Sequence, residues 1–290
     1  MNTDAQKLRI LVTGGTGLLG SALLKELEER GHDVDALRAD IRDAGALRDI
    51  AKEEKACDWI IHTAAMTDVS NCEEDRQLCY DTNVLGTKNI RDLASGVKAR
   101  LIYISTASVF SGETGDYKES DLPYPKNYYS LSKLLGEQLV LEYGLGLILR
   151  INLIGIHPQG SRGQNFFEWL LDSVKANRDI HLFNDVIINP LSNITLAELI
   201  GRITEIKPTE RILHLGSSNH VSKAAIGKLV IKHIKEYSGK ADYVSIDSIP
   251  GGAPRPKQMW LNMDYAQHTL GFTMPSLESE VEKILNHYTN

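Results

Sequence analysis

The residues best suited to chemistry in this 290-residue chain are Tyr129 and Lys133, in the segment Tyr-Ser-Leu-Ser-Lys. The apolar spacing around them predicts a helix over 129–143, and positions four residues apart on a helix share one face. A phenol with a pKa near ~10 is a poor acid–base catalyst at neutral pH, and a neighbouring ammonium group lowers that pKa. The pair therefore indicates acid–base catalysis, although the same spacing also arises by chance on surface helices.

Thr106 offers a third functional group, a hydroxyl that follows the apolar stretch 101–105. We predict a strand there, and a hydroxyl at its end can donate a hydrogen bond to the carbonyl oxygen of a substrate. The alternative is a threonine that satisfies only neighbouring backbone groups. A hydroxyl, a phenol and an ammonium group around one carbonyl would make a site for hydride transfer.

The stretch ILVTGGTGLLG, residues 10–20, indicates where a cofactor would bind. Three apolar residues predict a strand, glycines recur at 14, 17 and 20, and the leucines that follow predict one face of a helix. A strand, a glycine turn and a helix together bring backbone N–H groups and a helix N-terminus to a pyrophosphate. We therefore predict a dinucleotide site, because the strand and helix that the motif requires are both present.

The elements that must position these residues alternate between strands and helices over the first 150 residues. We predict strands at 10–13, 34–37, 59–63, 101–105 and 147–151, and helices at 18–30, 44–54, 83–94 and 129–143. A third strand that such folds often have is short or missing, because Arg38 and Ala39 run directly into Asp40. The alternation predicts an α/β fold with a doubly wound parallel sheet covered on both faces. Ligands bind at the carboxyl ends of such strands, where the stretches 14–17, 38–41, 64–67 and 105–106 all lie.

The later part of the chain predicts a small annex interleaved with this sheet. Helices are expected at 166–176, at 195–206 from a capping box of Thr195 and Glu198, after Ser222, and at 277–287, with short strands at 212–216 and 243–246. We expect residues 1–154 to bind the dinucleotide, with about 192–216 returning to that domain. Residues from about 155–191 and 217–290 are expected to form the substrate-binding annex.

Composition excludes several kinds of partner. The formal net charge of −6 gives no basic surface for nucleic acid or an anionic membrane. No apolar run approaches the roughly 18 residues of a membrane span, and the polar first nine residues predict no export signal. Three cysteines and nine histidines show no metal-ligand spacing, so we expect reduced thiols, no metal and a cytoplasmic location.

At this level of detail the chain resembles the extended short-chain dehydrogenases/reductases, also known as the NAD-dependent epimerase/dehydratase family. The motifs that carry the resemblance, in family order, are TGGTGLLG (13–20), DIRD (40–43), HTAA (62–65), NVLGT (83–87), ISTASVF (104–110), YSLSK (129–133) and LRIN (149–152). Looser matches at GQNFF (163–167), FNDVIINP (183–190) and APRPKQMWLN (253–262) indicate the branch of the dTDP-4-dehydrorhamnose reductases. The resemblance implies a Rossmann-type fold.

The resemblance also implies an activity, which is NAD(P)H-dependent reduction of a 4-keto group on a nucleotide-activated deoxysugar. Tyr129 would donate the proton, Lys133 would lower its pKa and bind the nicotinamide ribose, and Thr106 would hydrogen-bond the carbonyl. The implied cofactor-binding residues are Gly14, Thr16, Gly17, Leu18, Leu19, Gly20, Arg38, Asp40, Ile41, Ala64, Ala65, Asn83, Tyr129 and Lys133. The implied substrate-binding residues are Thr67, Ala107, Ser108, Leu153, Asn165 and Arg255.

Departures from the family pattern leave alternatives open. Ala107 and Ser108 stand where that branch usually has an acidic and an aromatic residue, and Leu153 stands where a tryptophan is usual. These differences predict a different substrate pocket, and Ala107 also argues against a dehydratase. A nucleotide-sugar 4-epimerase remains an alternative within the family. Another alternative is an NADP-binding regulatory subunit without turnover, like that of methionine adenosyltransferase, because a fold alone does not establish activity.

Cofactor and substrate preferences depend on a few cations. Arg38 stands where many relatives have the aspartate that binds the ribose 2′-hydroxyl, and a guanidinium can pair with a 2′-phosphate, so NADP(H) is favoured over NAD(H). The alternative is an arginine that simply faces solvent. Arg255 and Lys257 could hold the substrate's diphosphate, with Arg162 a weaker candidate for the same task, or could be solvated. Asn165 could bind sugar or phosphate oxygens, or cap the next helix.

By resemblance, we also expect a homodimer that pairs the helices 83–94 and 129–143 of two copies in a four-helix interface.

Overall fold

The computed structural model describes residues 6–54, 56–160, 164–248 and 253–288. The chain forms two compact units. Unit 1 comprises Met1–Ser105, Tyr128–Leu149 and Ala197–Leu213, and unit 2 comprises Thr106–Asn127, Arg150–Leu196 and His214–Asn290. Residues 106–127 group with unit 2, whereas the sequence analysis places them in the first domain.

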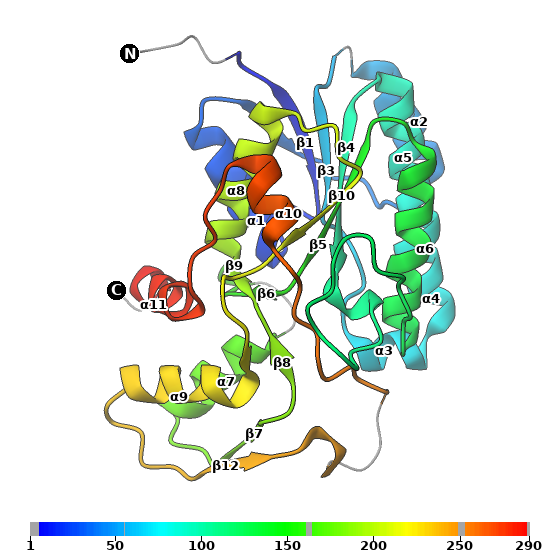
Figure 1. The fold of residues 1–290 in the computed structure, drawn as a ribbon. Coiled ribbons are helices and arrows are strands. Elements are labelled where there is room, and N and C mark those ends of the chain that lie inside the picture. The colour runs from blue at the N-terminus through cyan, green and yellow to red at the C-terminus, as the bar shows by residue number, and fades with distance from the viewer. Residues whose placement is uncertain (1–5, 55, 161–163, 249–252, 289–290) are drawn as a thin grey trace. The chain divides into compact units, whose positions relative to one another are not determined.

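Unit 1 is built on a six-stranded sheet with the order β10-β5-β4-β3-β1-β2 (Figure 1). Its strands are β1 (Arg9–Thr13), β2 (Asp33–Ala36), β3 (Trp59–His62), β4 (Arg100–Thr106), β5 (Gly146–Ile151) and β10 (Ile212–Leu215). Strand β1 pairs in parallel with both β2 and β3, and β3 pairs in parallel with β4. The predicted doubly wound, Rossmann-type sheet is confirmed, and β2 is its edge, with no further strand beyond it among the described residues. The strand order reverses at β1, which is where such sheets bind ligands.

Helices cover both faces of this sheet (Figure 1). One face carries α1 (Leu18–Glu29) and α8 (Asn193–Ile206), and the other carries α2 (Ala44–Glu53), α5 (Gly86–Val97) and α6 (Tyr128–Glu142). Fully buried strand residues such as Ile60, Leu101 and Ile148 pack against the helices through Ile90 and Val140. The apolar strand pattern read from the sequence is therefore the core of the unit.

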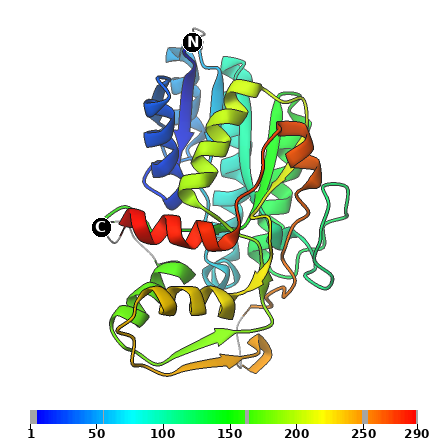
Figure 2. The same cartoon turned by 60° about the vertical axis from the view of Figure 1, so that its left-hand side comes forward.

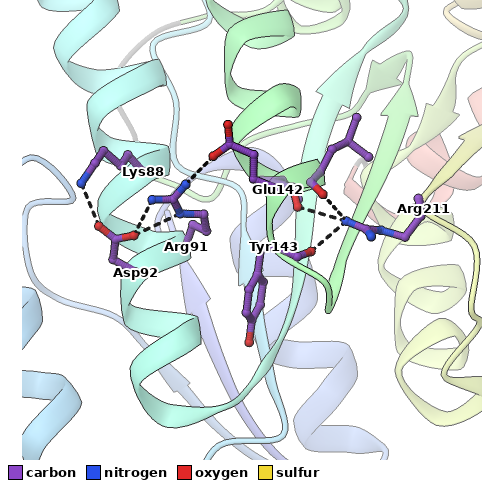
Figure 3. Close-up of polar contacts among 8 residues, drawn as sticks. Lys88, Arg91, Asp92, Glu142, Tyr143 and Arg211 are labelled. Atoms are coloured by element: carbon purple, nitrogen blue, oxygen red, sulfur yellow. Dashed lines mark hydrogen bonds and ion pairs between the residues drawn. The ribbon is translucent and has the colours of Figure 1, made fainter.

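Helices α5 and α6 are held together near the end of α6 (Figure 3). The Arg91 guanidinium contacts Glu142 at 2.9 Å, and the Tyr143 hydroxyl donates to the Ala99 carbonyl at 2.7 Å. Arg211, which precedes β10, donates to carbonyl oxygens in the last turn of α6 and just beyond it, including that of Tyr143 at 2.8 Å (Figure 3). These contacts fix the helix that carries Tyr129 and Lys133.

The segment before α5 differs from the sequence prediction. The helix expected from Asn83 begins earlier, because α3 (Val69–Glu74) and α4 (Arg76–Tyr80) precede a π-helical turn at Asp81–Leu85 that continues into α5. The Asp75 carboxylate caps α4 by accepting from the Leu78 N–H at 2.9 Å. Single π turns occur inside helices at functional sites, and here the turn contains Asn83.

Unit 2 contains short strand pairs and helices (Figure 2). The strands pair as β6 (Leu153–Ile154) with β9 (Leu191–Ser192), β7 (Ile180–Phe183) with β12 (Ala241–Val244), and β8 (Ile187–Ile188) with β11 (Val221–Ser222). The helices are α7 (Phe166–Lys175), α9 (Lys223–His233), α10 (Asp264–Leu270) and α11 (Leu277–Tyr288). Its core comes from α7, β7, α9 and α11, through buried residues such as Phe167, Leu182, Ile226 and Ile284.

One predicted helix start is wrong. The capping box expected at Thr195 and Glu198 is not the start of α8, which begins at Asn193. Ser192 takes that place, because its hydroxyl accepts from the Thr195 N–H at 3.1 Å. The Thr195 hydroxyl instead donates to the buried Glu280 carboxylate at 2.8 Å. In contrast, Ser222 does cap α9, as predicted. Among the described helices, none combines the length and apolar character that a membrane span requires.

Candidate active site

The glycine turn after β1 is a close-packed backbone cradle. Gly14 has a φ of +67°, and its carbonyl accepts from the Gly17 N–H at 2.9 Å. No side chain caps α1, whose N-cap residue is Gly17. A Cβ on Gly14 would lie 2.7 Å from the Thr63 hydroxyl, and a Cβ on Gly20 would overlap the Gly14 carbonyl. Side-chain-free backbone at a helix N-terminus, at the point where the strand order reverses, fits a dinucleotide's pyrophosphate.

A substitution at Gly20 tests this cradle. In Gly20→Ala the new methyl group overlaps backbone rather than a flexible side chain, so we expect a loss of about 1–3 kcal/mol in stability and weaker NADPH binding. Gly144→Ala is the matched control, because nothing lies within 4 Å of a Cβ there. Urea unfolding and fluorescence titration with NADPH measure the two effects, and equal behaviour of the two variants would contradict the assignment.

His62 links the glycine turn to α5. One ring nitrogen lies 2.8 Å from the Thr13 hydroxyl and the other 3.1 Å from the Thr87 hydroxyl. Burial, with the Lys133 charge as a second cause, lowers the pKa of His62 to about 3. The imidazole is therefore neutral and bridges two hydroxyls, and we assign it no proton transfer.

Asn83 ties α6 to the loop after β3. Its side-chain carbonyl accepts from the Met66 N–H at 2.8 Å, and its amide donates to the Met66 carbonyl at 2.9 Å. The same amide donates to the Ser132 hydroxyl on α6 at 2.9 Å. Ser132 in turn donates to the Tyr129 carbonyl at 2.7 Å. Asn83 thus fixes the turn of α6 that contains Tyr129 and Ser132.

Lys133 is buried with only 3% of its surface exposed. Its ammonium lies 4.0 Å from the ring centroid of Tyr103, a cation–π contact. Burial lowers the pKa of Lys133 to about 7, although Glu137 and Cys79 act in the opposite direction. A buried lysine with a shifted pKa, one helical turn after a tyrosine, is typical of a functional site, and in its protonated form it favours the tyrosine phenolate.

Glu137, one further turn along α6, was missed by the sequence analysis. It is fully buried, and its carboxylate accepts from the Ser105 hydroxyl at 2.5 Å. It also raises the pKa of Lys133 against the effect of burial. Tyr129, Lys133 and Glu137 recur at intervals of four residues, so all three share a face of α6. This spacing is the feature of the sequence that could have indicated Glu137.

The remaining predicted cofactor residues of unit 1 lie after β1, β2 and β3. Thr16 is exposed, Leu18 is half-buried, and Leu19 is buried in the first turn of α1; Ile41 is buried, and Ala64 and Ala65 are half-buried. The Asp40 carboxylate is bound by Arg42, which lowers the pKa of Asp40. Arg38 is exposed and makes no ion pair or hydrogen bond within the described residues. Thr67, assigned to the substrate, is also exposed.

In unit 2, Thr106 starts a turn of 3₁₀ helix at Ala107–Val109. Its hydroxyl accepts from the Ser108 N–H at 3.1 Å, so it also has the local backbone role that the sequence left open. Ala107 is buried, and the Ser108 hydroxyl lies 3.4 Å from the Met259 sulfur.

The other predicted substrate residues of unit 2 fall into two groups. Asn165 forms a capping box with Glu168, and its amide donates to the Gly155 carbonyl at 3.0 Å, so the capping alternative is the one observed. Leu153 is half-buried in β6, whereas Arg255 is exposed. Lys257 is paired with Asp185 at 3.0 Å and with Asp247. Arg162 lies outside the described residues.

The chain has a doubly wound sheet with a glycine cradle where the strand order reverses, and α6 carries a Tyr-x-x-x-Lys pair. Together these features define the class of short-chain dehydrogenases/reductases. Within that class, residues 8–290 match the family described as RmlD substrate binding domain, and the chain belongs to this family.

Similar proteins agree with this assignment. The chain is 27% identical to a probable low-salt glycan biosynthesis reductase of Haloferax volcanii, over 93% of this chain and 95% of that protein. It is 28% identical to a dTDP-4-dehydrorhamnose reductase of Mycobacterium tuberculosis, over 85% and 82%. It also superimposes on a dTDP-4-dehydrorhamnose reductase of Bacillus anthracis crystallised with NADP, with a TM-score of 0.89, 27% identity and coverage of 97% and 100%.

Proposed function

We propose that this protein is an NADPH-dependent reductase acting on the 4-keto group of a nucleotide-activated deoxysugar. The observation that carries the proposal is the Tyr129–Lys133 pair on α6, with Lys133 buried one helical turn after Tyr129. The relatives named as reductases of such sugars support the substrate class. The glycan biosynthesis reductase of Haloferax volcanii supports a role in polysaccharide biosynthesis.

In this mechanism NADPH, when bound, supplies the hydride. Tyr129 donates a proton to the oxygen of the reduced carbonyl. For Thr106, in unit 2, the role we propose is a hydrogen bond to the sugar substrate. The positive charge of Lys133 favours the phenolate that Tyr129 becomes, so the phenol gives up its proton more readily. Asn83 and Ser132 hold this part of α6 in place.

We assign cofactor binding to unit 1 and sugar recognition to unit 2. In unit 1 the cradle at Gly14, Gly17 and Gly20 receives the pyrophosphate, and Asp40 and Ile41 flank the adenine. Ala64 and Ala65 lie along the cofactor, and Thr67 contacts the substrate. In unit 2, Ala107, Ser108 and Leu153 line a sugar pocket that differs from the one usual in this branch.

Arg38 supports NADP(H) over NAD(H), because no carboxylate of the described residues pairs with it. We expect Arg38→Asp to reverse the preference by repelling the 2′-phosphate and accepting a hydrogen bond from a ribose 2′-hydroxyl. The ratio of kcat/KM for NADPH to that for NADH should fall by about 10²-fold, given roughly 1.5–3 kcal/mol for a charge-assisted contact. Arg48→Asp, at an exposed arginine on α2, is the control. An unchanged ratio in Arg38→Asp would remove Arg38 from the site.

The test of the activity is consumption of NADPH with a panel of 4-keto-deoxysugar nucleotides. A reductase consumes one NADPH for each sugar reduced. A 4-epimerase would convert sugar nucleotides without net consumption, and a regulatory subunit would bind NADPH without turning over any member of the panel. Either of these outcomes would replace the proposal.

A homodimer through α5 and α6 is part of the proposal. Leu85, Leu131 and Leu135 expose 38–39% of their surface on the π turn and α6, which suits a second copy of the same helices. Light scattering should give twice the chain mass, and a monomer would contradict it. We also propose a cytoplasmic location, since Cys57, Cys72 and Cys79 are free, buried thiols.

A further inference from the structure

Two cysteines of unit 1 lie together beside the turn of α6 that contains Tyr129. Cys72 on α3 and Cys79 on α4 are both 0% exposed, and their side chains are in hydrogen-bond contact. The third cysteine, Cys57, lies apart from them before β3 and donates to the Trp59 carbonyl at 3.1 Å. The proposed reaction uses neither thiol of the pair.

Both thiols of the pair join the hydrogen bonds that hold α6. The Cys79 S–H donates to the Ser132 hydroxyl at 3.4 Å, and the same hydroxyl accepts from the Asn83 amide. The Cys72 S–H donates to the Met66 carbonyl at 3.6 Å, which also accepts from Asn83. The Asn83 amide itself lies 3.5 Å from the Cys79 sulfur. A change at either sulfur therefore acts on the contacts of Asn83 with α6 and with the loop after β3.

The same contacts make the two thiols chemically unequal. The hydrogen bond with Cys72 is the largest cause that lowers the pKa of Cys79, and Ser132 and Asn83 add to it against the effect of burial. That hydrogen bond and burial raise the pKa of Cys72. The thiolate is the form that reacts with oxidants, so Cys79 is the nucleophile and Cys72 is placed to resolve its oxidised form. Burial raises the pKa of Cys57 to about 11, which leaves that thiol unreactive.

The segment between the two cysteines lies at the surface. Residues 74–78 are all exposed. Helix α3 has six residues and α4 has five, and Asp75 separates them. Helices this short have little stability of their own, so this segment can open locally while the sheet stays folded. Such an opening admits a small oxidant to the buried sulfurs.

We propose that Cys72 and Cys79 form a redox modification site, at which hydrogen peroxide produces a disulfide that lowers turnover by disturbing the α6 turn of Tyr129. The Cys79 thiolate attacks one peroxide oxygen and the O–O bond breaks, which gives a sulfenic acid and a hydroxide that takes up the proton lost by Cys79. The Cys72 sulfur then attacks the sulfenic sulfur, and the S–O bond breaks as water leaves with the Cys72 proton. Two thiols thus lose two electrons and two protons, and one peroxide becomes two waters. A dithiol reverses the change by exchange.

The disulfide acts on α6 by removing two S–H donors. The Ser132 hydroxyl and the Met66 carbonyl each lose a hydrogen bond, and the Cys79 sulfur is drawn toward Cys72. Because Ser132 donates to the Tyr129 carbonyl at 2.7 Å, the change reaches the turn that carries the phenol. The effect on turnover rests on the proposed function, whereas the disulfide rests on the two thiols alone.

The test is treatment of the full-length protein with hydrogen peroxide, followed by alkylation of the free thiols and mass spectrometry of its peptides. We expect a Cys72–Cys79 disulfide within one chain, an alkylated Cys57, and a loss of turnover of about tenfold or more that dithiothreitol restores, as for a displaced reacting group. Cys72→Ala should form no disulfide and stop at a Cys79 sulfenic acid, which dimedone traps. Cys57→Ala is the matched control and should respond as the wild type does. Alkylated Cys72 and Cys79 at peroxide concentrations that oxidise methionines, or a disulfide between two chains, would overturn the site.

A second readout needs no turnover. Hydrogen exchange of the backbone amides at 128–134 should be faster in the peroxide-treated wild type than in the same sample after dithiothreitol. An inactive protein would refute the proposed function, and the disulfide and the exchange rates would still test this inference. A disulfide that leaves both the exchange rates and the turnover of an active protein unchanged would refute the coupling to α6.

Discussion

Replacing Tyr129 with phenylalanine is expected to reduce NADPH-dependent turnover by about 10²–10⁴-fold, the range typical of a positioned proton donor. The substitution removes one hydroxyl and keeps the ring, so α6 and the Asn83–Ser132 contacts that fix it remain. NADPH affinity should stay within a few-fold of the wild type. Stopped-flow turnover and fluorescence titration measure the two quantities on the same samples.

Tyr128→Phe provides the control for that experiment. Tyr128 is the neighbouring residue on the same helix, and its ring lies under the Arg76 guanidinium, 5.4 Å from the centroid. Its hydroxyl has no role in the proposed chemistry, so turnover should be unchanged. Retained turnover in Tyr129→Phe, or equal losses in both variants, would remove Tyr129 from the mechanism.

Lys133→Met is expected to show two effects of a buried cation. Turnover should fall by about 10²-fold or more, because Tyr129 loses the charge that favours its phenolate. The free energy of unfolding of the variant should also depend less on pH than that of the wild type. With a folded-state pKa of about 7 against a model value of 10.5, the unfolded wild type binds more protons than the native protein between these values, so its stability rises with pH across that window.

The variant lacks this titration. The free energy of unfolding of the wild type should therefore rise relative to that of the variant, by up to about 1.4 kcal/mol per pH unit as the pH rises from about 7 to 10.5. Urea unfolding of the ligand-free proteins at several pH values measures this difference. Lys88→Met, at an exposed lysine on α5 paired with Asp92, should parallel the wild type. A constant difference between Lys133→Met and wild type would show that Lys133 is solvated as an ordinary lysine.

The parts of the fold that depend on local spacing could be predicted from the sequence. The glycine cradle needs small residues at fixed intervals after a strand, and the Tyr129–Lys133 pair needs one helical turn. Alternating strands and helices then predict the sheet, including its missing strand after β2. These signals are local, so no knowledge of distant contacts was required.

Other features depend on contacts between distant residues. The π turn at Asn83 is not visible in the spacing of apolar residues, because it inserts a residue into an otherwise regular helix. The buried position of Glu137 is explained by its hydrogen bond with Ser105, which is 32 residues away in the sequence. The sequence alone offers Lys257 and Arg255 equally as cations for an anionic ligand, whereas in the structure Asp185 pairs with Lys257. The local sequence predicts Thr195 as a helix cap. Its hydroxyl instead binds Glu280, which is 85 residues further along the chain and so invisible to a local pattern.

The sequence says least about the proposed sugar pocket. Ala107 and Ser108 replace the side chains usual in this branch, and Leu153 replaces a tryptophan. If these residues line the sugar pocket, the protein is expected to prefer a sugar other than the usual one. A panel that varies the sugar and keeps the nucleotide tests this preference through kcat/KM.

The most direct test of the proposed reaction is transfer of a labelled hydride. The protein is incubated with a nucleotide-activated 4-keto-deoxysugar and NADPH that carries deuterium at its transferable position, and the product is examined by mass spectrometry and NMR. We expect one deuterium on carbon 4 of the sugar for each NADPH oxidised, and no label transfer in Tyr129→Phe over the same time. A sugar product without deuterium, or oxidation of NADPH without a reduced sugar, would contradict the account.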